Sequence, residues 1–262
     1  MLSRFTTLAT TKAALSAIVF SVATVGLTQT AAAITTKNVV YTVDNEPYEG
    51  YYAKADKPNA PFILLLHDWD GLTEYERMRA DMLAEEGYNV FAADAFGQGI
   101  RPTSVDDKMH LTGGLDNDRN KMRRLMAGAL NAAQAEGNDV YNGVTMGYCF
   151  GGTLALELAR SGFEQKGFVI FHGGLDTPAG QNYDNTKGNI LVFHGTSDDV
   201  APFDSFVKLA ERLDDANVPN EMTTYGNVGH AFTESSSDSY NAYADKNSWN
   251  RYLDFLDTLY DK

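Results

Sequence analysis

Runs of strand length alternate with segments of helical periodicity along most of the chain. These runs, most of them apolar throughout, cover residues 62–67, 88–93, 144–148, 167–172, 189–194 and 221–225. Between them, apolar residues recur every three or four positions, which predicts helices over residues 73–86, 119–136, 153–160, 202–216 and 239–260. Buried strands that alternate with helices predict an α/β fold, with a mostly parallel, twisted sheet that helices cover on both faces.

Two regions depart from this alternation. Residues 37–43 and 48–53 are predicted to form a leading hairpin, because the proline and short polar residues of 44–47 favour a turn. Residues 94–118 are rich in glycine and charge and show no regular pattern. We interpret them either as part of a substrate rim above the strand ends or as an ordinary surface loop.

A capping box predicts where the helix after the 62–67 run begins. Thr73 and Glu76 have the spacing at which each side chain satisfies the backbone amide of the other. The apolar side chains that fall on one face of this helix are Tyr75, Met78, Met82 and Leu83. We expect this face to pack against the sheet.

The first 33 residues have the organisation of a secretory signal peptide. Arg4 and Lys12 precede an apolar stretch over residues 13–27, and small residues follow up to Ala33. Serine and threonine interrupt the apolar stretch, which is also shorter than the roughly 20 residues that a membrane-spanning helix needs. We therefore expect cleavage after Ala33, secretion or transfer to the periplasm, and one domain formed by residues 34–262.

Removal of this segment makes the chain more acidic. The segment contains two cations and no acids, so the formal charge of the mature chain changes from −14 to −16. Such a surface disfavours nucleic acids and anionic membranes as partners. We expect a small molecule as the partner, and the composition leaves the oligomeric state open.

The single cysteine, Cys149, lies where an apolar run gives way to a helical pattern. Gly147 stands two residues before it and Gly151 two residues after it. A nucleophile on a sharp strand-to-helix turn needs small residues there, because strand and helix come too close for side chains. One cysteine cannot form an internal disulfide, so an exported chain that keeps it must bury it or use it. The strand-to-helix turn favours a functional role for the Cys149 thiol.

An acid and a histidine follow two of the later predicted strands. Asp198 and Asp199 come after the run 189–194, and His230 comes after residues 221–225. In α/β-hydrolases the catalytic residues occur in the order nucleophile, acid, histidine, on loops that follow strands. The carboxyl ends of parallel strands are also where sites form in such sheets. The order predicts that Cys149, one of the two acids and His230 act together.

Several motifs resemble those of the dienelactone hydrolase family, over nearly all of the chain after residue 37. They are residues 147–152 (Gly-Tyr-Cys-Phe-Gly-Gly), 195–198 (Gly-Thr-Ser-Asp) with Pro202, 229–232 (Gly-His-Ala-Phe) and 67–71 (His-Asp-Trp-Asp-Gly). The resemblance implies an α/β-hydrolase fold and hydrolysis of a small ester or lactone through a thioester on Cys149. It also implies that His230 is the base and that Asp198 orients it, since the spacing to Pro202 favours Asp198 over Asp199.

The architecture further predicts which groups hold a tetrahedral oxyanion. The donors are the backbone amide after the nucleophile, here that of Phe150, and one from the loop after an earlier strand, here that of Trp69. Asp68 stands where the family has a carboxylate near the thiol, usually a glutamate. It either hydrogen-bonds the resting thiol, orients its loop or is a plain turn carboxylate.

Two positions depart from the dienelactone-cleaving members of the family. Those members hold the substrate carboxylate with arginines, one of them four residues beyond the catalytic histidine, where this chain has Glu234. The other arginine falls near residues 97–98, where the nearest cation in this chain is Arg101. The resemblance therefore implies the hydrolase class, and it does not carry dienelactone over as the substrate.

No cofactor is predicted. Five histidines and one cysteine form no close cluster with the spacing of metal ligands. The glycine-rich run around Cys149 lacks both the dinucleotide-binding spacing and the phosphate-binding lysine. Two other functions stay open, namely an exported, non-catalytic ligand-binding module and a redox-active thiol protein that cycles through small thiols.

Overall fold

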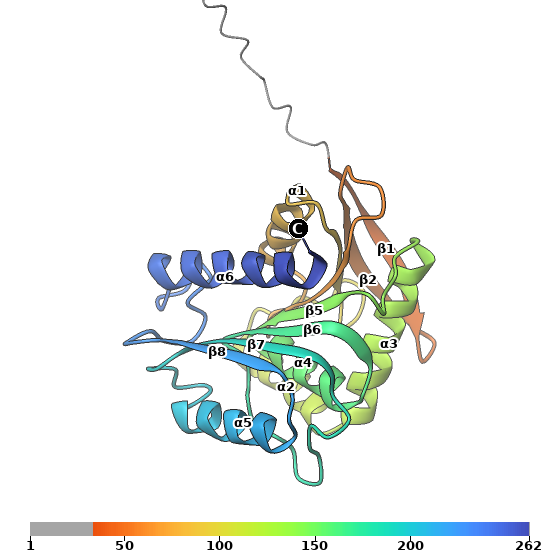
Figure 1. The fold of residues 1–262 in the computed structure, drawn as a ribbon. Coiled ribbons are helices and arrows are strands. Elements are labelled where there is room, and N and C mark those ends of the chain that lie inside the picture. The colour runs from red at the N-terminus through yellow and green to blue at the C-terminus, as the bar shows by residue number, and fades with distance from the viewer. Residues whose placement is uncertain (1–33, 262) are drawn as a thin grey trace, which may run out of the picture. The chain divides into compact units, whose positions relative to one another are not determined.

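The computed structural model describes residues 34–261, in which eight strands form one sheet (Figure 1). The strands are β1 (Thr35–Val43), β2 (Glu46–Lys54), β3 (Phe62–Leu66), β4 (Asn89–Ala93), β5 (Val144–Tyr148), β6 (Glu164–Phe171), β7 (Lys187–Gly195) and β8 (Asn220–Tyr225). Their order across the sheet is β1-β2-β4-β3-β5-β6-β7-β8. The β1–β2 hairpin joins β4 in antiparallel orientation, and the other neighbouring strands are parallel. The predicted mostly parallel sheet is confirmed.

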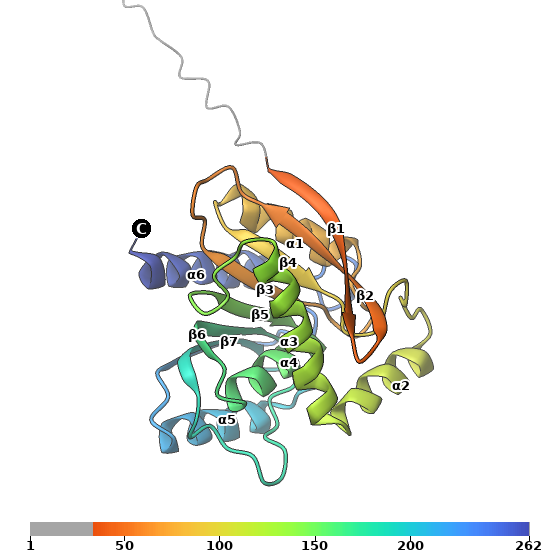
Figure 2. The same ribbon diagram turned by 90° about the vertical axis from the view of Figure 1, so that its right-hand side faces the viewer.

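Helices cover both faces of this sheet. They are α1 (Glu74–Glu85), α2 (Val105–Asp116), α3 (Arg119–Ala135), α4 (Phe150–Arg160), α5 (Phe203–Asp215) and α6 (Ala242–Tyr260). Helices α1 and α6 lie on one face, while α3, α4 and α5 lie on the other, and Figure 2 shows α3 and α4 in front of the strands. Two clusters of buried apolar side chains follow from this, one on each face. The predicted α/β fold class is confirmed.

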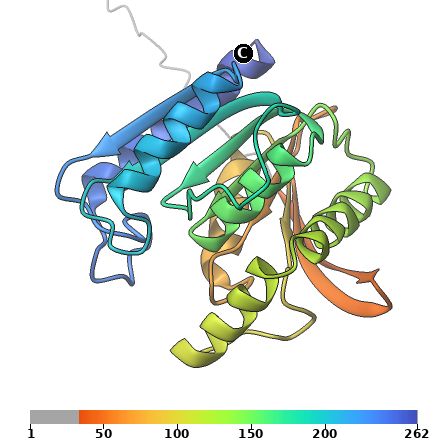
Figure 3. The same cartoon turned by 90° about the horizontal axis from the view of Figure 1, so that it is seen from below.

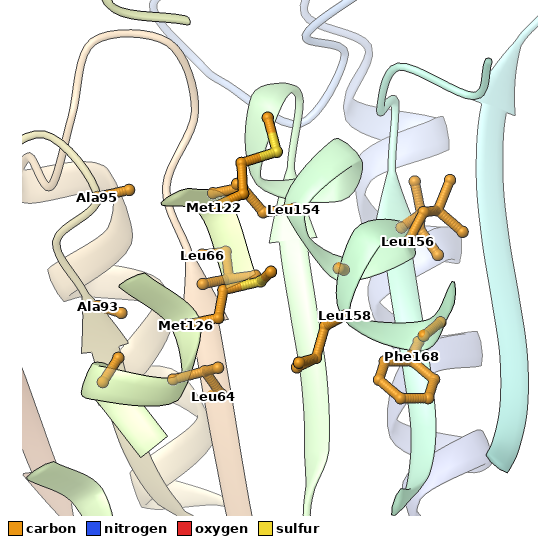
Figure 4. Close-up of a cluster of buried hydrophobic side chains, with 14 of the residues drawn as sticks. Leu64, Leu66, Ala93, Ala95, Met122, Met126, Leu154, Leu156, Leu158 and Phe168 are labelled. Atoms are coloured by element: carbon orange, nitrogen blue, oxygen red, sulfur yellow. The ribbon is translucent and has the colours of Figure 1, made fainter. Parts of the chain in front are cut away.

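Strand β3 shows why the central strands are apolar throughout. All five of its residues are buried, because successive side chains point to opposite faces and both faces are covered. Ile63 and Leu65 join the cluster on the side of α1 and α6. Figure 4 shows part of the other cluster, to which β3 contributes Leu64 and Leu66, α3 contributes Met122 and Met126, and α4 contributes Leu154 and Leu158.

The leading hairpin turns more tightly than expected. Only Asp44 and Asn45 form its turn, with φ angles of 53° and 68°. Glu46 and Pro47 already belong to β2 and pair with Val43 and Thr42. Two consecutive residues with positive φ match the right-handed twist of the paired strands, so the chain needs no longer turn.

Part of the segment predicted to be irregular is helical. Helix α2 lies within residues 94–118 and is drawn in yellow-green at the bottom of Figure 3. The Ser104 hydroxyl caps it by accepting a hydrogen bond from the Asp107 amide. Leu115 is the one residue of α2 that is buried. A helix with so little buried surface has no apolar periodicity, which is why the sequence pattern did not reveal it.

The buried face of α1 also differs from the prediction. The capping box of Thr73 and Glu76 is confirmed. However, Met78 is exposed, whereas Glu76 and Arg79 are buried. The cap satisfies the Glu76 carboxylate, and Arg79 pairs with Asp245 of α6 at 2.6 Å. Specific hydrogen bonds thus allow two charged side chains to lie on the face that periodicity assigned to apolar ones.

The predicted signal peptide, residues 1–33, lies outside the described residues. None of the helices within residues 34–261 has the length and apolar character needed to cross a bilayer.

Candidate active site

Cys149 lies on a sharp turn between β5 and α4, as the sequence predicts. Its φ and ψ angles are 49° and −113°, which is a strained backbone conformation for a residue with a side chain. A Cβ atom on Gly147 would lie 2.1 Å from the Gly151 carbonyl carbon, and one on Gly151 would lie 2.1 Å from the Leu66 carbonyl oxygen. The two glycines therefore permit the close approach of strand and helix that projects the thiol from the carboxyl edge of the sheet.

Three loops bring a sulfur, an imidazole and a carboxylate together at this edge. His230, on the loop after β8, has its Nε2 atom 3.0 Å from the Cys149 sulfur. Its Nδ1 atom lies 2.8 Å from Oδ2 of Asp198, on the loop after β7. The three side chains thus form a continuous relay of hydrogen bonds, in the arrangement that the order of the motifs predicts.

The loop after β7 fixes which acid faces the imidazole. The Oδ1 atom of Asp198 accepts hydrogen bonds from the backbone amides of Val200 and Ala201, at 2.9 and 2.8 Å. These bonds leave Oδ2 free to face His230. Asp199, the alternative acid, is exposed to solvent. The geometry thus pairs the histidine with Asp198.

The relay favours a positively charged His230. Burial alone would lower the pKa of this imidazole, but the hydrogen bonds with Asp198 and Cys149 outweigh burial and raise the pKa to about 10. Burial likewise acts to raise the pKa of Asp198, and the hydrogen bond and charge of His230 reverse this effect, so that the pKa is lowered. An imidazolium 3.0 Å from the sulfur favours negative charge on that atom.

The predicted oxyanion donors stand next to this relay. Phe150 is the first residue of α4, and an amide at that position has no carbonyl partner within its own helix. The positive end of the α4 dipole adds to the stabilisation of an anion at this point. Trp69 lines the same cavity as Cys149. Their assignment as donors to an oxyanion remains a prediction.

A cavity of about 420 Å³ opens over the thiol. Cys149 and His230 contribute to its wall, together with Trp69 and several charged side chains. One of these is Lys108 of α2, so the segment that we interpreted as rim or surface loop does reach the site. The cavity has the size of a small-ligand site.

Asp68 lines this cavity. Within residues 34–261, it forms no hydrogen bond with the Cys149 thiol. Its Oδ1 atom accepts from the amide of Asp70, at 2.9 Å, and its own amide donates to Glu76, at 3.5 Å. Burial, together with the nearby carboxyl group of Glu234, raises the pKa of Asp68 to about 7. Of the three roles considered for Asp68, these contacts support the orientation of its loop.

Three carboxyl groups, those of Asp68, Asp70 and Glu76, come within 4.8 Å of one another beside the site. Glu76 accepts hydrogen bonds from the amide and the hydroxyl of Thr73, and Asp68 accepts the turn hydrogen bond of Asp70. The helix cap and the loop turn therefore account for how these acids are arranged.

A buried network behind His230 was not predicted from the sequence. The His172 ring packs against the His230 ring with centroids 5.2 Å apart, and its Nε2 atom lies 2.7 Å from Oγ1 of Thr233. The Tyr75 hydroxyl lies 2.7 Å from the same oxygen, and Arg79 donates to the Thr233 carbonyl at 2.9 Å. These contacts hold the loop that carries His230.

This network also places an uncharged side chain, His172, against the His230 imidazole. Burial lowers the pKa of His172 well below its usual value, and the charge on His230 acts in the same direction. His172 is therefore neutral at physiological pH. The sequence predicts only that His172, at the end of the run 167–172 and before two glycines, lines a pocket, and Thr233 shows no pattern that marks it.

A mostly parallel sheet, a thiol on a strained turn after a central strand, and an acid and a histidine on the loops after later strands define an α/β-hydrolase. The sequence signature of the dienelactone hydrolase family matches residues 48–260, and the chain belongs to this family. The resemblance seen in the motifs is thereby confirmed.

Relatives and a solved structure agree with this assignment. The carboxymethylenebutenolidase of Rhodococcus opacus is 27% identical in an alignment of 240 positions that covers 82% of this chain and 88% of the relative. That of Pseudomonas putida is 25% identical in an alignment of 235 positions that covers 85% of this chain and 96% of the relative. A dienelactone hydrolase-like promiscuous phosphotriesterase from metagenomic libraries has a TM-score of 0.81 and 28% identity, covering 87% of this chain and 99% of its own. The protein is a dienelactone hydrolase-like hydrolase with a small-molecule substrate.

Proposed function

We propose that this hydrolase cleaves a small ester or lactone through a thioester on Cys149, with His230 as acid and base and Asp198 as the group that orients His230. The observation that carries the proposal is the relay of 3.0 and 2.8 Å from sulfur to imidazole to carboxylate. It supplies a nucleophile, a proton carrier and a fixed orientation, which are the three elements of acyl transfer by this class of site.

The reaction then follows from the positions of these groups. The sulfur attacks the carbonyl carbon, a carbon–sulfur bond forms, and the carbonyl electron pair moves to the oxygen. The amides of Phe150 and Trp69 stabilise that oxyanion. As it collapses, the alcohol leaves with the proton of His230, and a thioester remains on Cys149. Water attacks the thioester while His230 removes its proton, and the acid product and the thiol are released.

The comparisons support an oxygen ester as the bond that is cleaved. Two relatives are named for a butenolide, which is a lactone. A non-catalytic binding module would not require the relay. A redox role would need a small thiol to complete the cycle, because Cys149 is the only cysteine in the chain.

Acyl-enzyme formation tests the proposal directly. The protein is mixed with phenyl acetate, quenched in acid and digested, and its peptides are analysed by mass spectrometry. We expect one acetyl group on the peptide that contains Cys149, and its removal by neutral hydroxylamine, which cleaves thioesters. An adduct on another residue, or phenol release that persists after Cys149 has been alkylated with iodoacetamide, would contradict the mechanism.

Exchange of Asp198 for asparagine tests the orienting role. Asparagine keeps an oxygen for the amides of Val200 and Ala201 but removes the charge that holds His230 protonated. We expect kcat/KM to fall by about 10²–10⁴-fold, the usual range for general acid–base catalysis. The pKa of His230 falls without its partner, so the alkaline limb of the pH–rate profile moves to lower pH. Asp199→Asn removes the same charge from the neighbouring exposed residue and should leave both quantities unchanged.

We also propose that the mature protein is secreted or periplasmic and begins at Ile34. The charged start, the short apolar stretch and the small residues before that position support export. The intact mass of the protein recovered from outside the cytoplasm checks the cleavage position.

A further inference from the structure

The cavity over the thiol is lined by more acidic than basic side chains. Three carboxyl groups face it, those of Asp68, Asp70 and Glu234, against one amine, that of Lys108. The positive charge of His230 does not offset these acids, because it is balanced by Asp198 and by the sulfur that it activates.

The single lysine of the cavity is already engaged. Its Nζ atom lies 3.6 Å from Oδ2 of Asp70 and 4.8 Å from the centre of the Trp69 ring. Arg101, the candidate cation from the sequence, donates instead to the backbone carbonyls of Leu72 and Ile100 and does not line the cavity. Neither cation is therefore free to receive a substrate carboxylate.

The two remaining acids form a pair at the wall of the cavity. Asp68 and Glu234 both line the cavity, and burial together with the Glu234 carboxyl group raises the pKa of Asp68. Asp68 is buried, and Glu234 extends from the loop that carries His230. A pair of this kind accepts a neutral or cationic group beside it, whereas a third carboxylate would add a like charge where little water is available to screen it.

We propose that this pair makes the enzyme selective for esters that carry no carboxylate, and that Glu234 is a specificity-determining residue. The selection applies to either side of the ester bond, because a cavity of about 420 Å³ places every part of a small substrate near the pair. This inference rests on the proposed ester hydrolysis, because that reaction defines the substrates. The discrimination against carboxylates at the thiol can also be measured without turnover.

Matched phenyl esters test the selection during catalysis. Phenyl valerate and monophenyl glutarate share a leaving group and differ mainly in a terminal methyl or carboxylate, and the phenyl ester of trimethylammoniobutyrate supplies a cation. After subtraction of uncatalysed hydrolysis, we expect kcat/KM to be about a hundredfold lower for the glutarate than for the valerate. The cationic ester should be cleaved at least as well as the valerate. Equal rates for glutarate and valerate would overturn the inference.

Two variants test whether the pair of Asp68 and Glu234 causes the preference for the uncharged ester. Glu234→Gln removes one carboxyl charge and should reduce the preference for valerate over glutarate by about tenfold. Asp238→Asn removes the same charge from an exposed residue on the same loop, outside the cavity, and should leave the preference as it is. A preference that is unchanged in Glu234→Gln, or changed equally in both variants, would contradict the assignment.

Alkylation of Cys149 separates this inference from the proposed function. Iodoacetamide and iodoacetate each form a carbon–sulfur bond and release iodide, and they differ in charge. Relative to free cysteine, we expect the rate with iodoacetate to be depressed at least about tenfold more than that with iodoacetamide, and Glu234→Gln to reduce this difference. If no ester is cleaved but the alkylation rates differ in this way, the hydrolase mechanism fails and the charge selection stands. Similar relative rates with the two reagents would refute the charge selection whatever the esters show.

Discussion

Replacement of Cys149 by alanine should lower kcat/KM for a phenyl ester by more than about 10⁴-fold, since removal of a nucleophile eliminates the covalent route. Oxyanion donors and substrate binding alone supply the small rate that remains. Steady-state hydrolysis by the variant and by the wild type, measured in parallel, gives the ratio of the two kcat/KM values. Cys149→Ser should also lose most activity, because the imidazolium that stabilises a thiolate does not ionise a hydroxyl group.

The alanine variant provides its own check on folding. Alanine tolerates the strained φ angle of residue 149 about as well as cysteine does, and it leaves no buried polar group at that position. Its thermal unfolding, followed by circular dichroism, should therefore resemble that of the wild type. A folded alanine variant that retains more than about one hundredth of the wild-type rate would show that the sulfur is not the nucleophile.

The second large effect concerns stability. Gly151→Ala would place a Cβ atom 2.1 Å from the carbonyl oxygen of Leu66, which belongs to the backbone of β3 and cannot rotate away. Helix α4 would have to move from the sheet. We expect the free energy of unfolding to decrease by at least about 3 kcal/mol, at the upper end of overpacking effects, with a melting temperature lower by about 10 °C.

An alanine elsewhere serves as the matched control. Gly113 lies in α2, and a Cβ atom there would meet nothing within 4 Å. Because alanine is the better helix former, Gly113→Ala should leave stability unchanged or raise it by up to about 1 kcal/mol. Denaturant unfolding of the two variants and the wild type gives the change in the free energy of unfolding for each substitution. A loss of stability in Gly151→Ala no larger than in the control would show that the strand–helix contact is not the reason for the glycine.

The features that the sequence predicted depend on local requirements. Glycines on both sides of Cys149 mark the close contact of β5, α4 and β3, because no other residue fits there. The 62–67 run predicts a strand covered on both faces, since all of its central side chains must be apolar. The order of the cysteine, the acid and the histidine along the chain predicts which three loops meet. Each of these inferences needs only a short stretch of chain and the general geometry of a parallel sheet.

The features that escaped prediction depend on distant partners. Arg79 looks like an exposed helix residue until Asp245, 166 positions away, is seen to pair with it. The carboxyl groups of Asp68 and Glu234 come from two distant loops that line the same cavity, and neither residue carries a local mark of the other. Helix α2 buries too little surface to leave an apolar period. Sequence pattern thus locates the reactive groups better than it describes the surroundings that select a substrate.

The order of the strands has a consequence for the nascent protein. Cys149 precedes His230 by 81 positions, and β8, from which His230 follows, is an edge strand of the described sheet and pairs with β7. An isolated cysteine is mostly protonated and slow to react at neutral pH. The sulfur therefore gains the imidazole beside it only when the last strand has docked. In the proposed mechanism, a chain that has not finished folding does not yet carry an activated thiol.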